Sequence, residues 1–146
     1  MVVRPSPSVH GEGDHGFVPM LIAHAREKGV SAFVGDGRNR WNAIHRSDAA
    51  AVYVGALADA VAGRRYHAVA EPEIPFERIA TGIGALLGLP VKSLSPEQAE
   101  AHFGWLAMFV GIDCPTSNER TRRWLGWEPS GPTLLDDLTN GTYPRS

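Results

Sequence analysis

The segments with strand composition are short in this 146-residue sequence and lie far apart. These strand-like runs cover residues 1–4, 31–34, 41–45 and 66–70. Between and after them, helical spacing of apolar residues and helix-start signals mark residues 17–28, 47–61 and 75–88. A doubly wound α/β domain is built on a parallel sheet of about five or six strands. The sequence therefore predicts an α/β chain that is richer in helix than in strand and lacks such a sheet.

Capping residues indicate where the helices begin and end. Gly29 is expected to end the first helix, and Ser47 is expected to cap the alanine-rich second helix. Residues 95–98 and 116–119 each have the form of a capping box, in which a Ser or Thr precedes a Gln or Glu by three positions. A last helical turn or two is expected over residues 133–138.

Composition excludes several classes of partner. A net charge of −2 gives no electrostatic attraction to nucleic acid or to an anionic membrane. No apolar run approaches the roughly 20 residues that span a bilayer, and the opening MVVRPSPS lacks the apolar core of a signal peptide. Cys114 is the only cysteine, which excludes a disulfide framework and a thiolate zinc site. We expect one cytoplasmic domain over residues 1–146.

A glycine motif near the N-terminus has the letters of a dinucleotide-binding fingerprint. Gly11, Gly13 and Gly16 form a literal G-x-G-x-x-G before the first helix. Asp36 follows 20 residues later, where a ribose-binding acid would be expected. These four residues raise the possibility of a self-sufficient cofactor site.

The surroundings of these glycines argue against that site. Seven residues, two of them prolines, separate Val3 from Gly11, whereas the fingerprint begins directly at the end of a strand. Glu12 and Asp14 place carboxylates where a pyrophosphate would bind, and like charges repel. Asp36 lies in a Gly-Asp-Gly turn. We therefore expect the glycines to form no cofactor site.

Three segments resemble parts of the extended short-chain dehydrogenase/reductase family, the NAD(P)-dependent epimerases and dehydratases. Residues 3–13 (VRPSPSVHGEG) resemble the turn R-x-x-x-V-Y/H-G-x-G after the sixth strand of that family's nucleotide-binding domain. Residues 41–50 (WNAIHRSDAA) resemble its D/W-x-x-I/V-H-V-x-D-x-A strand and helix, and residues 125–129 (LGWEP) resemble its C-terminal L-G-W-x-P. They occur in the family's order and together cover nearly the whole chain.

The resemblance implies a helix-rich, small C-terminal substrate domain of a Rossmann-type protein, with the main nucleotide-binding sheet largely missing. Residues 1–10 would be the remnant of the last Rossmann strand and its following loop. The family's glycine-rich cofactor turn and its catalytic Tyr-x-x-x-Lys come earlier in its chains and are absent here. No Tyr of this sequence has a Lys four positions later, because Lys28 and Lys92 are the only lysines. No residue replaces that Tyr as general acid/base or the Lys that lowers its pKa.

Site residues carry over from the resemblance position by position. Ser6, Pro7, Ser8 and Val9 match the loop that passes the nicotinamide end of NAD or NADP, and are candidate cofactor-binding residues. The alternative interpretation of this loop is a proline-stiffened surface turn. The candidate substrate-binding residues are His10, Trp41 and His45.

Two departures from the family pattern concern its nucleotide-sugar clamps. Family members that act on nucleotide-sugars usually hold the diphosphate of the substrate with an arginine just before this strand. The matching position here is Trp41, and Arg40 lies one position away, on the opposite face of a strand. The family's second clamp, the Arg of R-P-G-D, aligns with Val110. Both departures argue against a nucleotide-sugar, so the small-molecule substrate stays open.

Three other groups of residues have simpler interpretations. The six histidines show no metal-binding spacing, so no metal site is expected. The apolar cluster within residues 103–109 indicates a core helix, or a surface that packs on the absent nucleotide-binding half. Arg120, Arg122 and Arg123 are typical of a solvated helix face, with anion binding as the alternative.

The sequence therefore predicts the C-terminal part of an NAD(P)-dependent epimerase/dehydratase-like oxidoreductase, which forms the substrate pocket. We expect this chain alone to bind no cofactor and to be inactive, either as a truncated gene product or as a fragment that needs an N-terminal nucleotide-binding partner. The alternative is a non-enzymatic binding or interaction module derived from the same domain.

Overall fold

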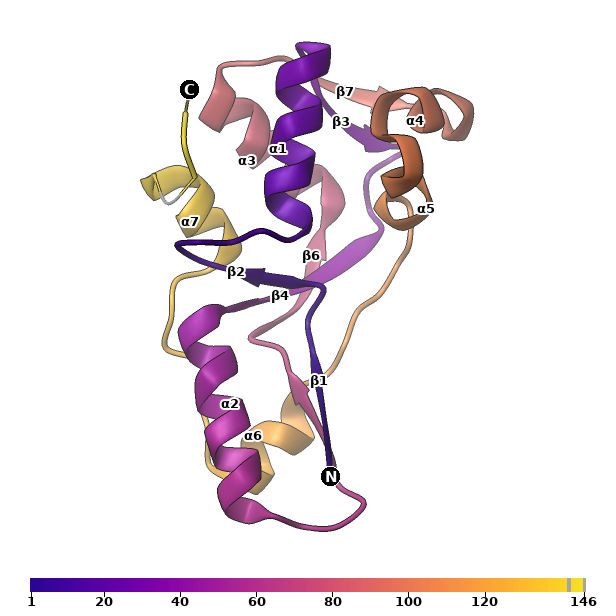
Figure 1. Cartoon of the computed structure of the whole chain (residues 1–146). Helices are drawn as coiled ribbons and strands as arrows, with labels where there is room; N and C mark the ends of the chain where they lie inside the picture. The colour runs from indigo at the N-terminus through magenta and orange to yellow at the C-terminus, as the bar shows by residue number, and fades with distance from the viewer. Residues whose placement is uncertain (142, 146) are drawn as a thin grey trace.

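The computed structural model describes residues 1–141 and 143–145, and it confirms a helix-rich α/β fold (Figure 1). The strands are β1 (Val2–Pro5), β2 (Ser8–His10), β3 (Ser31–Val34), β4 (Arg40–His45), β5 (Arg65–Ala68), β6 (Glu71–Pro75) and β7 (Val91–Leu94). The helices are α1 (Phe17–Lys28), α2 (Arg46–Asp59), α3 (Phe76–Leu87), α4 (Pro96–Phe103), a 3-10 turn (Gly104–Leu106), α5 (Ala107–Val110), α6 (Glu119–Leu125) and α7 (Leu134–Asn140).

In the described residues, the strands form three small sheets and no continuous parallel sheet. Strands β1 and β5 pair in parallel, and so do β3 and β7. The third sheet has the order β2-β4-β6, in which β2 is parallel to β4 and β6 is antiparallel to it. The expected absence of a five- or six-stranded parallel sheet is therefore confirmed for this part of the chain.

Strand β4 separates two hydrophobic cores. Trp41 and Ala43 belong to the large core, which also contains buried residues of α1, α3, α4 and α7 in the upper part of Figure 1. The side chain of Ile44 points to the opposite face of the strand and belongs to the small core, together with residues of α2 and β5, in the lower part of Figure 1. The large core is enclosed by helices, whereas the small core lies between one helix layer and a two-stranded sheet.

The first strand extends through Pro5 and a second strand, β2, follows at Ser8–His10, whereas the sequence predicted a strand over residues 1–4 alone. The backbone nitrogens of Val2 and Ser6 donate to the carbonyls of Arg64, just before β5, and Ala68, the last residue of β5, at 2.9 and 3.1 Å. Alternate residues of a parallel strand face opposite edges, so Pro5 faces the edge of β1 that has no partner strand. Its missing N–H therefore removes no bond from the pair, and the strand continues through the proline.

Helix ends agree with the sequence at some positions and differ at others. Gly29 and Gly88 end α1 and α3 in the left-handed conformation, and the capping box of Ser95 is present. The cap of α2 is His45 rather than Ser47, because the imidazole accepts from the Ser47 backbone nitrogen. The capping box expected over residues 116–119 is absent, since Asn118 is the N-cap of α6 and its side chain makes no capping hydrogen bond.

Candidate functional site

The loop between β1 and β2 is held by hydrogen bonds from its own serine. The Ser6 hydroxyl donates to the Asn42 carbonyl of β4 at 2.7 Å and accepts from the Ser8 backbone nitrogen at 3.0 Å. Ser6 and Ser8 are buried, Val9 is half-buried and Pro7 is exposed. The four candidate cofactor residues therefore form a fixed turn in which only Pro7 is broadly open to solvent.

Two openings flank this loop, and Pro7 lines both of them. One has a volume of about 240 Å³ and is lined by Arg4, Pro5, Pro7, Asn42, His67, Val69 and Thr116. The Asn42 amide donates to the Cys114 carbonyl at 2.8 Å and to the Thr116 hydroxyl at 3.2 Å, which fixes the wall of this opening. The second opening, of about 370 Å³, lies between the glycine stretch and Arg46.

His10 is the centre of a buried polar cluster behind the loop. Its side chain has no exposed surface, and Nδ1 donates to Asp137 Oδ2 of α7 at 2.5 Å. Nε2 lies 3.9 Å from Glu71 Oε2 and has no hydrogen-bond partner among the described residues. Burial raises the pKa of the Glu71 carboxyl, although the Leu134 backbone nitrogen donates to it at 2.8 Å. The cluster thus brings polar side chains of β2, β6 and α7 together in the interior.

His45 lies beside this cluster, at the junction of β4 and α2. Its ring packs edge-on against His10 with centroids 5.4 Å apart, and its Nε2 is 4.0 Å from Asp137 Oδ2. The other ring nitrogen is paired with the Ser47 hydroxyl at 2.7 Å. Two of the three candidate substrate residues, His10 and His45, are therefore adjacent, and both face Asp137.

Trp41, the third candidate, is separated from this pair and lies inside the large core. Its ring packs edge-on against Phe76 and Phe17, with centroid distances of 5.0 and 5.7 Å. Phe17 also contacts Trp105 and Phe109, so an aromatic cluster extends from Trp41 to the surface. The Trp41 indole nitrogen is buried without a hydrogen-bond partner in the described chain.

The apolar segment 103–109 is divided between core and surface. Phe103 and Leu106 are buried in the large core, as a core helix requires. Trp105 and Met108 are 58% and 68% exposed. The expected single core helix is wrong, because α4 ends at Phe103 and a 3-10 turn (Gly104–Leu106) separates it from α5. One side of the segment is buried in the core, and the other side projects apolar side chains into solvent.

Arg40 is engaged by acidic side chains rather than free for a ligand. Its guanidinium forms a two-point contact with Asp113, at 2.9 and 2.8 Å, and a contact of 2.8 Å with Glu73. These bonds raise the Arg40 pKa further, and they lower the pKa of Asp113 to about 2. This arrangement ties β4 to β6 and to the segment before α6.

Asp48 has a role that the sequence analysis missed. It lies in the first turn of α2, as expected, but its carboxylate also accepts from the backbone nitrogens of Ser130 and Gly131 at 3.0 and 2.9 Å. Gly131 approaches so closely that a Cβ there would lie 2.9 Å from the Cβ of His45. The closely packed Gly131, just after the L-G-W-x-P segment, is the only sequence signal for this contact.

The glycine stretch is closer to a strand than the sequence indicated, since β2 ends directly before Gly11. That argument against the fingerprint was wrong, but two structural features oppose the fingerprint. Strands β2 and β3, on either side of α1, lie in different sheets and form no β-α-β unit. The Asp14 carboxylate also accepts from the Gly16 backbone nitrogen at the start of α1, at 2.7 Å, and from the Tyr143 hydroxyl at 2.6 Å.

Residues 1–141 and 143–145 contain neither a metal-ligand cluster nor a membrane-spanning helix. No group of three or more His, Cys, Asp or Glu side chains is placed to hold a metal ion there. No helix in that part of the chain combines the length and apolar character that a membrane crossing needs.

Comparison of sequences finds relatives that are about twice as long as this chain. No protein-family model matches. An uncharacterized protein of Schizosaccharomyces pombe is 51% identical over 142 residues, which cover 97% of this chain and 48% of that protein. An uncharacterized protein of Saccharomyces cerevisiae is 46% identical over 137 residues, covering 94% of this chain and 46% of that protein. The chain thus spans about half the length of the curated relatives it matches.

Comparison of structures identifies the fold. A dTDP-glucose 4,6-dehydratase of Streptomyces venezuelae, solved with NAD, matches 96% of this chain and 41% of its own with a TM-score of 0.69 and 19% identity. A human epimerase family protein solved with NADPH matches 95% and 46%, with a TM-score of 0.65 and 24% identity. The fold is therefore that of one part of the extended short-chain dehydrogenase/reductase proteins, the class that the sequence resembled.

Proposed function

We propose that this chain is the substrate-binding part of an NAD(P)-dependent epimerase/dehydratase-like oxidoreductase. The observation that carries the proposal is the match of almost the whole chain to less than half of a dehydratase solved with NAD. In the proposed arrangement the loop Ser6–Val9 is one wall of the nicotinamide site, and the opening between the glycine stretch and Arg46, which His10 lines, receives a small-molecule substrate. His10 and His45 position that substrate through the polar cluster with Asp137.

A second part of the proposal concerns the open edge of β1. This strand has a partner strand, β5, on one side only, and its unpaired backbone groups face the other side. Two-stranded sheets are marginal on their own, and parallel sheets are ordinarily buried on both faces. We propose that a nucleotide-binding polypeptide segment adds its strands to this edge and brings the cofactor and the general acid/base that this sequence lacks.

The test is reconstitution with the remaining part of the Schizosaccharomyces pombe relative. The region of that protein which this chain does not match is expressed separately and mixed with the 146-residue chain. The proposal expects a 1:1 complex by analytical ultracentrifugation and NADH or NADPH binding by the mixture. A mixture of two folded components that neither associates nor binds cofactor would contradict it.

A binding module without enzymatic activity is the second candidate, and the exposed apolar side chains favour it. Trp105, Met108 and Ile112 project from the segment around α5, where a partner could cover them. The triple variant W105S/M108S/I112S distinguishes the two functions. Loss of partner binding with cofactor binding of the reconstituted complex unchanged would favour the module.

A further inference from the structure

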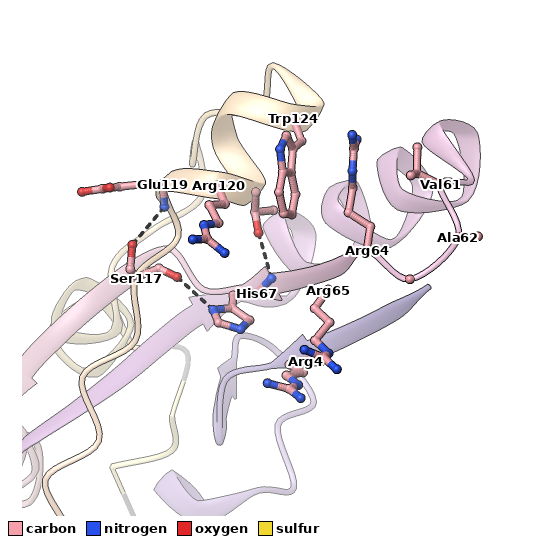
Figure 2. A pocket seen from close by; sticks show the side chains of 12 residues that line it. Arg4, Val61, Ala62, Arg64, Arg65, His67, Ser117, Glu119, Arg120 and Trp124 are labelled. Carbon is pink, nitrogen blue, oxygen red and sulfur yellow. Dashed lines mark hydrogen bonds between the residues drawn. The ribbon is translucent and has the colours of Figure 1, made fainter.

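A further cavity, separate from the loop Ser6–Val9, lies at the other end of strand β1. It has a volume of about 800 Å³ and lies beside the β1–β5 pair and α6 (Figure 2). In the register of this pair Arg4 is opposite His67 and Val2 is opposite Arg65, so these side chains share one face of the sheet. The other face carries Val3 and Tyr66, which pack in the small core.

The cavity concentrates positive charge in a chain whose net charge is −2. Its lining includes four arginines, contributed by β1, the turn before β5, β5 itself and α6: Arg4, Arg64, Arg65 and Arg120. Three of them, Arg4, Arg65 and Arg120, make no ion pair or side-chain hydrogen bond with any described residue. Glu119 is the one acidic residue in the lining, and Figure 2 shows its side chain pointing away from Arg120.

One wall of the cavity is fixed by contacts that leave the three arginines free. Arg64 is held by Asp59 at 2.5 Å and lies 4.7 Å above the ring of Trp124. The His67 ring donates from Nδ1 to the Ser117 carbonyl at 3.0 Å, and its backbone nitrogen donates to the Thr121 hydroxyl at 2.8 Å. The cavity is therefore built on an ordered frame of side chains.

The chemistry of the lining identifies the class of ligand. Unpaired guanidinium groups in one cavity repel each other, and a multiply charged anion removes that repulsion. Guanidinium forks match the oxygens of phosphate in a two-point geometry, and a cavity of this volume is of the size that receives small molecules. The cationic groups gather in one hollow instead of along a stripe, which favours a small anion over a nucleic acid.

We propose that this cavity is a binding site for the diphosphate group of a small molecule, held by Arg4, Arg65 and Arg120. No residue of the loop Ser6–Val9 lines it, although Arg4 and His67 line both this cavity and the opening beside Pro7 and Asn42, and the proposal goes beyond the proposed function.

The test is isothermal titration calorimetry of the 146-residue chain with pyrophosphate at low ionic strength. We expect saturable 1:1 binding with a dissociation constant below about 1 mM. Arg65→Gln and Arg120→Gln each remove one charge-assisted contact and are expected to weaken binding by about fivefold or more. Arg123→Gln is the matched control, because Arg123 is an exposed residue of the same helix that does not line the cavity.

Three results would overturn the proposal. The first is the absence of saturable pyrophosphate binding by a chain whose circular dichroism shows it to be folded. The second is an equal loss in Arg123→Gln and Arg120→Gln, which would reveal a general charge effect. The third is binding of a 12-nucleotide DNA strand without binding of pyrophosphate. Weaker binding of inorganic phosphate than of pyrophosphate would support the proposal, because pyrophosphate carries more negative charge and more oxygens for the three guanidinium groups.

Discussion

The large and small cores differ in how completely they are covered. Helices surround the large core on several sides, and its buried residues include Leu21 of α1, Ile79 of α3 and Phe103 of α4. The small core is covered by α2 and by one face of the β1–β5 pair. The outer face of α2 leaves Val54 and Leu57 67% and 65% exposed, and the outer edge of β1 has no strand partner.

The region around the large core is therefore closed by its own helices. The region around the small core contains a two-stranded sheet with an open edge, as expected for part of a larger sheet. Apolar helix faces and strand edges are normally buried against another layer, and both remain open around the small core. The three unpaired arginines of the basic cavity also belong to that region. The molecule thus keeps its most closed packing around α1 and α3, and its surfaces available for partners and ligands around β1 and β5.

The largest expected effect compares one deletion in each core. Ile79 and Ile44 both have 0% exposure, and each is replaced by Ala. We expect Ile79→Ala to lower the free energy of unfolding by about 4 kcal/mol and Ile44→Ala by about 2 to 3 kcal/mol. The smaller loss is expected at Ile44 because the few elements around the small core can move into the cavity that the substitution leaves. Urea denaturation measures both values. A larger loss for Ile44→Ala than for Ile79→Ala would contradict the conclusion that the small core is less completely covered.

The next effect concerns the contact that closes the junction between the cores. Asp48→Ala removes the acceptor for the Ser130 and Gly131 nitrogens and should cost about 2 kcal/mol of unfolding free energy. Asp48→Asn keeps one carbonyl acceptor and should cost less. Thermal denaturation of both variants provides the measurement, and equal costs would show that the hydrogen bonds are not the cause.

A smaller effect appears in acid. The Arg40 guanidinium holds the pKa of Asp113 at about 2 in the folded chain, below its ordinary value of 3.8. A depressed pKa contributes stability that is present above the unfolded value and is lost as the pH falls from about 4 toward 2. Asp113→Asn should therefore flatten the fall in melting temperature across that window. An unchanged slope would mean that other carboxyls dominate acid unfolding.

The smallest effect on stability is expected on the outer face of α2. Val54→Gln and Leu57→Gln change exposed side chains and should alter the free energy of unfolding by less than about 0.5 kcal/mol. They should nevertheless reduce self-association, measured by sedimentation velocity, because they remove apolar surface. A loss of more than about 1 kcal/mol would show that this face is already packed.

Local signals in the sequence predicted much of the helical structure. The bounds of α1 agree with the predicted residues 17–28, because apolar spacing and the terminal Gly29 are properties of the segment itself. Strand β6 was missed, since Glu71–Pro75 contains two prolines and two glutamates and is a strand only through its pairing with β4. Strand β7 was missed for a similar reason, because its four residues extend alongside β3.

The candidate site depended on contacts between distant residues. The sequence singled out His10 and His45 but not their shared partner Asp137, which is 127 residues beyond His10. It interpreted Arg120 as a solvated helix residue with anion binding as the alternative, and only the fold brings Arg120 together with Arg4 and Arg65. Such pairings depend on topology, which a local pattern does not encode.

The most direct measurement of the central claim is a fluorescence titration of NADH and NADPH into the monomeric 146-residue chain. The double variant Arg65→Gln/Arg120→Gln is titrated alongside, so that binding through the arginine-lined cavity is distinguished from binding at a nicotinamide site. We expect no saturable change in nicotinamide fluorescence, because the cofactor would need the nucleotide-binding segment at the edge of β1. Saturable micromolar binding by the chain alone would contradict it, and would assign a complete cofactor site to these residues.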